Sequence, residues 1–133
     1  MPITQEQCDK FAQEWLAAWN SRSIDAIMHH YADSIVFSSP FAIAIAPASA
    51  GLIKVKEQLR NYFSAALAKY PDLHFELFQV LVGVSSVVLY YKSVKDLYAA
   101  ETMVIKKAKE SDSGEDKFVI EQVYCHQINK NIV

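Results

Sequence analysis

Apolar residues recur at helical spacing near the start of the chain. Phe11, Trp15 and Trp19 follow one another every four residues, which places them on one face of a helix. Thr4 precedes this stripe with the spacing of a capping box, and a polar break begins at Asn20. We therefore expect an amphipathic helix from about Thr4 to Asn20, with its aromatic face buried.

Two further helices are predicted by the same criterion. Ser23 is suited to cap a second helix, in which apolar residues keep helical spacing as far as Tyr31. A third helix is expected from Ile53 to about Lys69, and Pro71 marks its end. All three helices have an apolar face that must cover another element.

The segment between the second and third helices is harder to interpret. Ser34–Ser39 has the composition of a strand, and Pro40 ends it by removing a hydrogen-bond donor. Phe41–Gly51 is apolar but contains Pro47. We expect a short strand or loop against apolar surface, either as a lid over a pocket or as a loop packed on the core.

The rest of the chain alternates between strand-like segments and short turns. The predicted strands are Leu73–Val82, Val87–Val94, Tyr98–Lys107 and Phe118–Ile128. Glu110–Asp116 is expected to be a solvated hairpin tip. Short turns between consecutive strands imply an antiparallel meander, so helices followed by strands predict an α+β domain.

Composition narrows the function classes. Apolar residues make up 52% of the 133 residues and charged residues 21%, which excludes a disordered chain. A net charge of −2 without a basic stripe gives no footprint for nucleic acid. The apolar runs are too short to span a membrane, and no leader pattern is present. With Cys8 and Cys125 as isolated thiols, we expect a cytoplasmic protein.

Several segments resemble a known superfamily when taken in order. They are Trp15–Asn20 (WLAAWN), Tyr31–Asp33 (YAD), Val36–Pro40 (VFSSP), Lys56–Phe63 (KEQLRNYF) and Gln122–Asn129 (QVYCHQIN). This series resembles the superfamily of nuclear transport factor two, ketosteroid isomerase and the SnoaL-like polyketide cyclases. The resemblance implies one domain over residues 1–133, a cystatin-like cone with three N-terminal helices on a curved, mostly antiparallel sheet.

The resemblance does not carry over the isomerase chemistry. The catalytic base of ketosteroid isomerase falls at Ser39, and its two oxyanion donors fall at Trp15 and at Thr102 or Glu101. Serine is no base at neutral pH without a partner. Only Tyr31 matches a tyrosine of the isomerase hydrogen-bond network, so we expect no steroid isomerisation.

The same cone implies a pocket between helices and sheet. The residues expected to line it are Trp15, Trp19, Tyr31, Phe37, Ser39, Phe41, Tyr62, Phe63, Tyr98, Thr102, Glu121, Val123 and Cys125. An aromatic stripe of this kind also suits a filled core. If the pocket is open, its guest is expected to be a small apolar molecule.

Glu121 is the one candidate for catalysis. An inward position between valines would raise the pKa of its carboxyl by desolvation; the alternative is a paired or solvated carboxylate. His29 and His30 are adjacent on a helix and cannot clamp one metal ion, and no glycine-rich phosphate loop is present. We therefore expect neither a metal ion nor a cofactor.

Two functions remain open on these grounds. The first is a protein that binds a small molecule in the cone, as a divergent cyclase, isomerase or dehydratase or as a binder without turnover. The second is a non-catalytic dimerisation or protein-interaction module with a vestigial pocket. Phe118, Ile120 and Tyr124 alternate on the last strand, so we expect an apolar outer sheet face and a homodimer through it.

Overall fold

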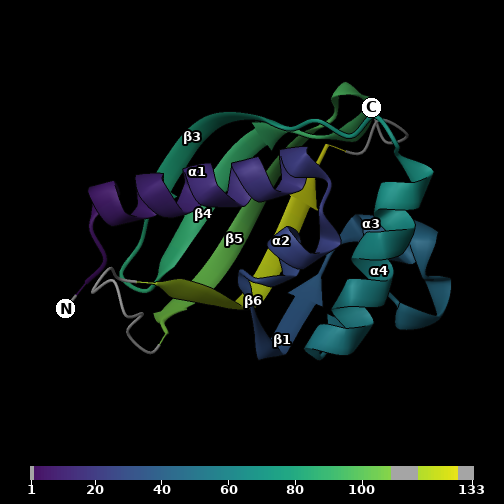
Figure 1. Ribbon diagram of the computed structural model, residues 1–133, viewed down its shortest axis with the longest axis horizontal. Helices are drawn as coiled ribbons and strands as arrows, with labels where there is room; N and C mark the ends of the chain where they lie inside the picture. The colour runs from purple at the N-terminus through teal and green to yellow at the C-terminus, as the bar shows by residue number, and fades with distance from the viewer. Residues whose placement is uncertain (1, 109–116, 129–133) are drawn as a thin grey trace.

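The computed structural model describes residues 2–108 and 117–128 (Figure 1). Its helices are α1 (Gln5–Ser21), α2 (Ile24–Met28), α3 (Pro40–Ile45) and α4 (Lys56–Lys69), with short 3₁₀ turns η1 (Pro47–Ser49) and η2 (Val94–Asp96). Its strands are β1 (Tyr31–Ser38), β2 (Leu52–Lys54), β3 (Glu76–Val82), β4 (Ser86–Lys92), β5 (Tyr98–Lys107) and β6 (Phe118–Gln127). The expected hairpin tip, Glu110–Asp116, lies outside the described residues.

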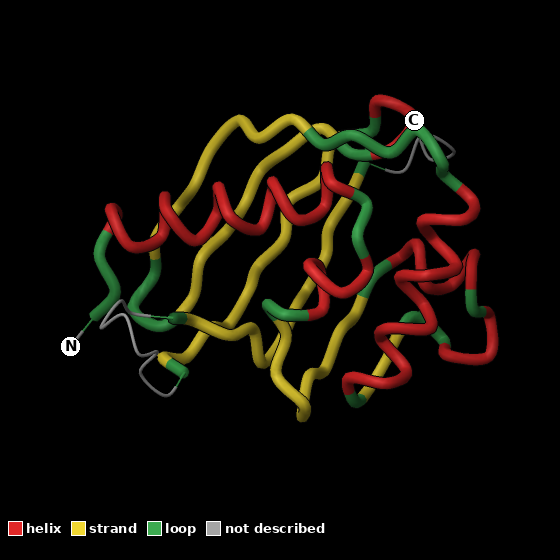
Figure 2. Tube along the Cα trace, viewed as in Figure 1, coloured by secondary structure: helices red, strands yellow, loops and turns green. Residues whose placement is uncertain are grey.

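The described strands form one sheet in the order β2-β1-β6-β5-β4-β3. Strands β3 to β6 are an antiparallel meander, as predicted, whereas β1 runs parallel to β6. Helix α1 crosses β3, β4 and β5, while α3 and α4 gather at the other end of the sheet beyond β1 (Figures 1 and 2). The fold is therefore the predicted α+β, cystatin-like arrangement, with one more short helix than expected.

Helix α1 confirms its sequence pattern. The amide N–H of Gln7 donates to Thr4 Oγ1 at 3.1 Å, and the Thr4 N–H donates to Gln7 Oε1 at 2.9 Å, which completes the capping box. Phe11, Trp15 and Trp19 are all buried. Within the described part of the chain, no helix is long and apolar enough to cross a membrane.

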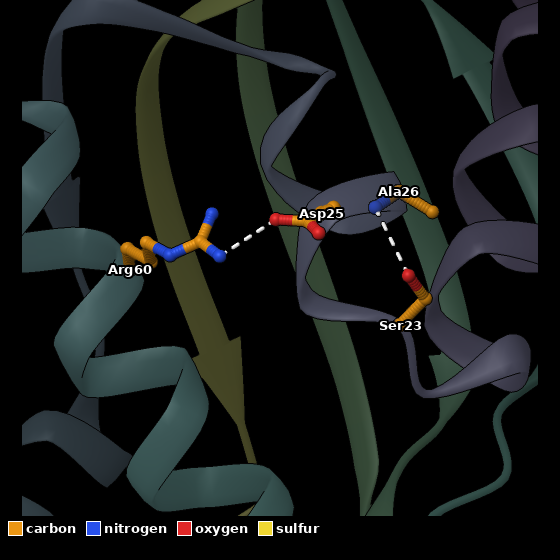
Figure 3. A network of polar contacts seen from close by, with 4 residues as sticks. All are labelled: Ser23, Asp25, Ala26 and Arg60. Carbon is orange, nitrogen blue, oxygen red and sulfur yellow. Dashed lines mark hydrogen bonds and ion pairs between the residues drawn. The ribbon is translucent and has the colours of Figure 1, made fainter.

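Helix α2 is shorter than predicted because the residues after it pair with the sheet. The carbonyl of His30 accepts a hydrogen bond from the Ile120 N–H at 2.8 Å, and Tyr31 already belongs to β1. Ser23 caps the helix through the Ala26 N–H at 3.3 Å. Asp25 and Arg60 form an ion pair at 2.6 Å that joins α2 to α4 (Figure 3).

The Phe41–Gly51 segment contains the end of helix α3, as far as Ile45, and the 3₁₀ turn η1, so the expected strand is not found there. Pro40 occupies the first turn of α3, where its missing N–H costs nothing, and the Ser39 hydroxyl accepts from the Phe41 N–H at 3.2 Å. After it, β2 pairs with β1, so α4 begins at Lys56 rather than at Ile53.

A bulge interrupts the pairing of β5 with β6. Val104 faces Gln122, but Ile105 faces Ile120, which leaves Glu121 without an opposite residue. Ile120 is consequently buried in the core. The expectation that Ile120 belongs to the outer face is therefore wrong, because the bulge reverses the alternation at this point of β6.

Candidate functional site

A cavity lies between α3, α4 and the ends of β4, β5 and β6 that are nearest to them. Its volume is about 60 Å³, and one water needs roughly 10–15 Å³ in this measure. Ligand pockets for drug-sized molecules measure roughly 300–1,000 Å³. In this conformation the cavity therefore accepts only a molecule of a few heavy atoms or the end of a longer one.

Aromatic rings form a large part of the cavity wall. The ring centroid of Trp19 lies 4.7 Å from that of Phe63 and 5.4 Å from that of Phe75. Phe41 of α3 and Tyr70 after α4 meet at 6.3 Å on the same wall and are only partly buried. The deep wall is thus rigidly packed, and the partly exposed rings mark the side facing solvent.

A carboxyl group faces this apolar space from β5. Glu101 is 6% exposed, and its Oε1 accepts a hydrogen bond from the Tyr91 hydroxyl of β4 at 2.5 Å. Cys125 lies opposite Glu101 on the neighbouring strand β6, and its thiol donates to the same oxygen at 3.7 Å. The second oxygen, Oε2, has no hydrogen-bond partner in the described protein.

Burial controls the titration of this cluster. Desolvation raises the pKa of Glu101 to about 7, although the hydrogen bonds from Tyr91 and Cys125 act in the opposite direction. Desolvation, followed by the nearby Glu101, also raises the pKa values of Tyr91 and Cys125. Near neutral pH Glu101 can therefore both give and take a proton, while its two neighbours stay protonated as donors.

Unpartnered polar atoms gather at the same cavity. In residues 2–108 and 117–128, three buried side-chain atoms lack a hydrogen bond: Trp19 Nε1, Glu101 Oε2 and Gln127 Oε1. All three residues line the cavity. Such atoms are rare in folded proteins, and each calls for an explanation.

Some of the predicted pocket residues lie on this wall. They are Trp19, Phe37, Ser39, Phe41, Tyr62, Phe63 and Cys125. Trp15, Tyr31 and Val123 also point inward, but they are packed in the core rather than on the wall. The Trp15 indole donates to the Tyr31 hydroxyl at 3.3 Å. Desolvation, followed by the nearby Glu101, raises the pKa of that hydroxyl, although the two indoles act in the opposite direction. Trp19 Nε1 itself makes no hydrogen bond.

The expectation that Tyr98 and Thr102 point into the cone is wrong. Tyr98 stacks on the outer face with Phe78 at 5.5 Å and Tyr90 at 6.0 Å, and Thr102 lies opposite the exposed Tyr124. The alternation of β5 is shifted by one residue from the expected one. A shift of one residue moves every side chain to the other face.

The inward position expected for Glu121 is also wrong. Its carboxylate forms an ion pair with Lys106 Nζ at 3.0 Å, and its side chain is 35% exposed. The bulge that buries Ile120 turns Glu121 away from the cavity. The alternative, a paired carboxylate, is the arrangement found.

Sequence reasoning missed the acid that does face the cavity. Glu101 was named only as a neighbour of Thr102, and Tyr91 and Gln127 were not singled out. The structure buries Val87, Leu89 and Tyr91 of β4, but residues 87–91 (VVLYY) are apolar on both faces, so the sequence alone does not show which of them point inward. Pairing in register with β4 then sends Glu101 inward, because it lies opposite Leu89.

The described residues offer little to a metal ion. Within 2–108 and 117–128, no group of three His, Cys, Asp or Glu side chains is placed to bind one. Asp25 pairs with Arg60 rather than sharing a site with His29. Ser39, at the position of the isomerase base, caps α3 with its hydroxyl.

Comparisons with known proteins agree with this architecture. The SnoaL-like domain family matches residues 12–105. A SnoaL-like protein of unknown function from Burkholderia thailandensis is 35% identical; the alignment covers 97% of this chain and 100% of that one, with a TM-score of 0.82. Among curated proteins, no significantly similar sequence is found.

More distant structures share the fold alone. A protein from Agrobacterium tumefaciens, provisionally described as an isomerase of the SnoaL-like family, is 15% identical over 94% of this chain and 100% of that one, with a TM-score of 0.66. A nuclear transport factor two-like protein of unknown function from Cytophaga hutchinsonii is 13% identical over 99% and 96%, with a TM-score of 0.63. With a family match over more than half of its length, the chain belongs to the SnoaL-like domain family.

Proposed function

We propose that the chain binds a small, largely apolar molecule in this cavity and that Glu101 transfers a proton to or from it. The observation that carries the proposal is a buried carboxyl in an aromatic cavity, hydrogen-bonded to Tyr91, with a pKa raised to about 7. A group with a pKa near the working pH is suited to general acid–base catalysis. The provisional isomerase description of the Agrobacterium protein concerns the same class of chemistry.

The site supports a different chemistry from steroid isomerisation. Ser39 lies where that enzyme has its base, and its hydroxyl is occupied as the cap of α3. Among residues 2–108 and 117–128, Glu101 is then the one carboxyl on the cavity wall, so it has to serve as both acid and base. The small volume also favours a ligand shorter than a steroid unless α3 moves.

Hydrogen exchange on a small ketone tests this proposal without a known substrate. Butan-2-one in D₂O exchanges its α-protons when a base removes them, and ¹H NMR follows the loss of signal. We expect the wild type to accelerate exchange, by up to roughly 10²- to 10⁴-fold, and Glu101→Gln to lose the acceleration. The matched control is Glu121→Gln, which keeps it. A wild type that exchanges no faster than Glu101→Gln refutes the proposal.

We also propose a homodimer through the outer sheet face, the feature that the interaction-module alternative needs. Phe78, Tyr90 and Tyr98 form an exposed aromatic cluster with centroids 5.5–6.0 Å apart. Tyr124 on the same face is 48% exposed. Exposed apolar patches of this kind mark interaction surfaces, and a second copy is the simplest partner.

Light scattering at tens of micromolar tests the dimer. We expect twice the monomer mass for the wild type and the monomer mass for Tyr98→Lys, which places a charge in the aromatic cluster. The matched control is Lys54→Ala on β2, away from this cluster. A monomeric wild type contradicts the dimer and leaves the proposal for the cavity untouched.

A further inference from the structure

Three unpartnered side-chain atoms indicate which hydrogen-bonding groups a ligand in the cavity must carry. Trp19 Nε1 carries a hydrogen and can only donate, whereas Gln127 Oε1 can only accept. Glu101 Oε2 accepts when the carboxyl is ionised and becomes a donor when it holds the proton. The wall thus presents donors and an acceptor together, and the rest of its surface is mainly aromatic and aliphatic.

The sheet brings two of these groups close together. Glu101 faces Cys125, and Ala99 faces Gln127, on the paired strands β5 and β6. Glu101 and Gln127 therefore occupy diagonal positions on the same face of neighbouring strands. At this separation one small ligand can contact both side chains. Trp19 reaches the same space from α1, held between Phe63 and Phe75.

Hydrogen-bond matching then restricts the guest. In this structure the three atoms have almost no contact with solvent, so a ligand that fills the cavity without forming hydrogen bonds to them leaves them unsatisfied. A hydrocarbon leaves all three atoms bare. A simple ketone accepts from Trp19 and protonated Glu101 but leaves Gln127 bare, and a buried acceptor without a partner costs roughly 1–3 kcal/mol.

We propose that the ligand is a small hydroxycarbonyl compound, or its enol, bound with its carbonyl oxygen on Trp19 and Glu101 and its hydroxyl on Gln127. This inference rests on the proposed function, because it names the ligand class of the same cavity. The polar end lies deep in the wall. Any apolar remainder points toward the partly exposed rings of Phe41 and Tyr70.

Two probes of equal size test the pattern by NMR at pH 6, below the raised pKa of Glu101. Hydroxyacetone has a carbonyl and a hydroxyl, whereas butan-2-one has the carbonyl alone. The two tryptophan indole signals of ¹⁵N-labelled protein report on binding, since Trp19 Nε1 is unpartnered and Trp15 Nε1 already donates to Tyr31. Trp19→Phe assigns the signals.

We expect both probes to shift the Trp19 indole signal and to leave the Trp15 signal nearly unchanged. Hydroxyacetone should bind roughly three- to tenfold more tightly, the value of one net hydrogen bond. Gln127→Met should abolish this preference without weakening butan-2-one. Gln122→Met, on the exposed face of the same strand, should retain it.

The outcomes separate the two proposals. If butan-2-one binds and exchanges its α-protons but hydroxyacetone gains nothing, the ligand class is wrong and the proposed function stands. If the preference survives Gln127→Met, the assignment of Gln127 is wrong. If neither probe shifts the Trp19 signal, the cavity takes no such ligand and both proposals fail.

Discussion

The two halves of the β5–β6 ladder place their acids in opposite environments. In the regular half, Glu101 faces the aromatic cavity and is 6% exposed. In the half that contains the bulge, the unpaired Glu121 points outward to Lys106 at 3.0 Å. The two strands are neighbours throughout, so the difference comes from one unpaired residue and not from the surrounding fold.

This contrast has a chemical consequence. Desolvation raises the pKa of Glu101 to about 7, which gives it a proton to donate near neutral pH. The exposed ion pair of Glu121 has no such environment, and pairs of this kind contribute little to stability. The regular pairing with Cys125 therefore keeps Glu101 on the cavity wall, while the bulge turns Glu121 away from the interior.

The largest expected effect is on the pH dependence of stability. The folded-state pKa of Glu101, about 7, lies above the ordinary glutamate value of 4.5. Partly buried His30, whose pKa desolvation lowers to about 4, makes the protein gain stability over part of this range, but ionisation of Glu101 alone should destabilise the wild type by about 3 kcal/mol as the pH rises from 4.5 through 7. Glu101→Gln removes this contribution. Between pH 5 and pH 8, urea unfolding should show Glu101→Gln gaining about 2–3 kcal/mol of stability relative to the wild type, because the contribution of His30 is the same in both proteins.

Measuring at two pH values also separates the titration of Glu101 from a general loss of stability in the variant. A buried amide in Glu101→Gln leaves a polar group partly unsatisfied, but that cost is the same at both pH values. An unchanged wild-type difference in the variant would show that Glu101 is solvated in the folded protein. The contrast with Glu121 would then disappear.

A smaller effect is expected when the main donor to Glu101 is removed. The Tyr91 hydroxyl stabilises the carboxylate form, so Tyr91→Phe should raise the pKa of Glu101 further above about 7. A hydrogen bond to a charged group contributes about 1.5–3 kcal/mol, which corresponds to a shift of about one to two pH units. A ¹³C NMR titration of the glutamate carboxyls measures it. A downward shift contradicts the assigned hydrogen bond.

Much of the fold could be predicted from local patterns. The capping box, the aromatic stripe of α1 and the alternation of the meander are local signals, and each is found in the structure. The helix in Phe41–Gly51 was missed because Ala and Ile residues next to proline fit several conformations. Its cap, Ser39, and the proline in its first turn were the signals that favoured a helix.

Local sequence patterns could not identify the acid that faces the cavity. Both faces of β5 carry apolar residues, since Val104 on the outer face alternates with Met103 and Ile105 on the inner one. On β6, the adjacent Val119 and Ile120 break the alternation without showing where the bulge lies. Register and bulges depend on the partner strand, so local sequence left the choice between Glu101 and Glu121 undecided.

Replacing the outward-pointing Glu121 should have only a weak effect on stability. Glu121→Gln breaks the ion pair with Lys106, and an exposed pair contributes about 0–1 kcal/mol. Its loss should lower the free energy of unfolding by less than about 1 kcal/mol, and added salt should reduce the effect further. The wild-type difference between pH 5 and pH 8 should remain. If Glu121→Gln instead gains stability relative to the wild type between pH 5 and pH 8, Glu121 and not Glu101 is the buried acid.

The smallest expected effect comes from the thiol beside Glu101. Cys125 donates to Glu101 Oε1 at 3.7 Å, and a thiol is a weak donor. Cys125→Ala removes this support for the carboxylate, so the pKa of Glu101 should rise, by less than in Tyr91→Phe. The smaller side chain also leaves room for water, which lowers the cost of desolvation and acts in the opposite direction. The same ¹³C titration separates the two causes: a small rise means that the hydrogen bond dominates, whereas a fall means that solvent entry into the cavity governs the acid.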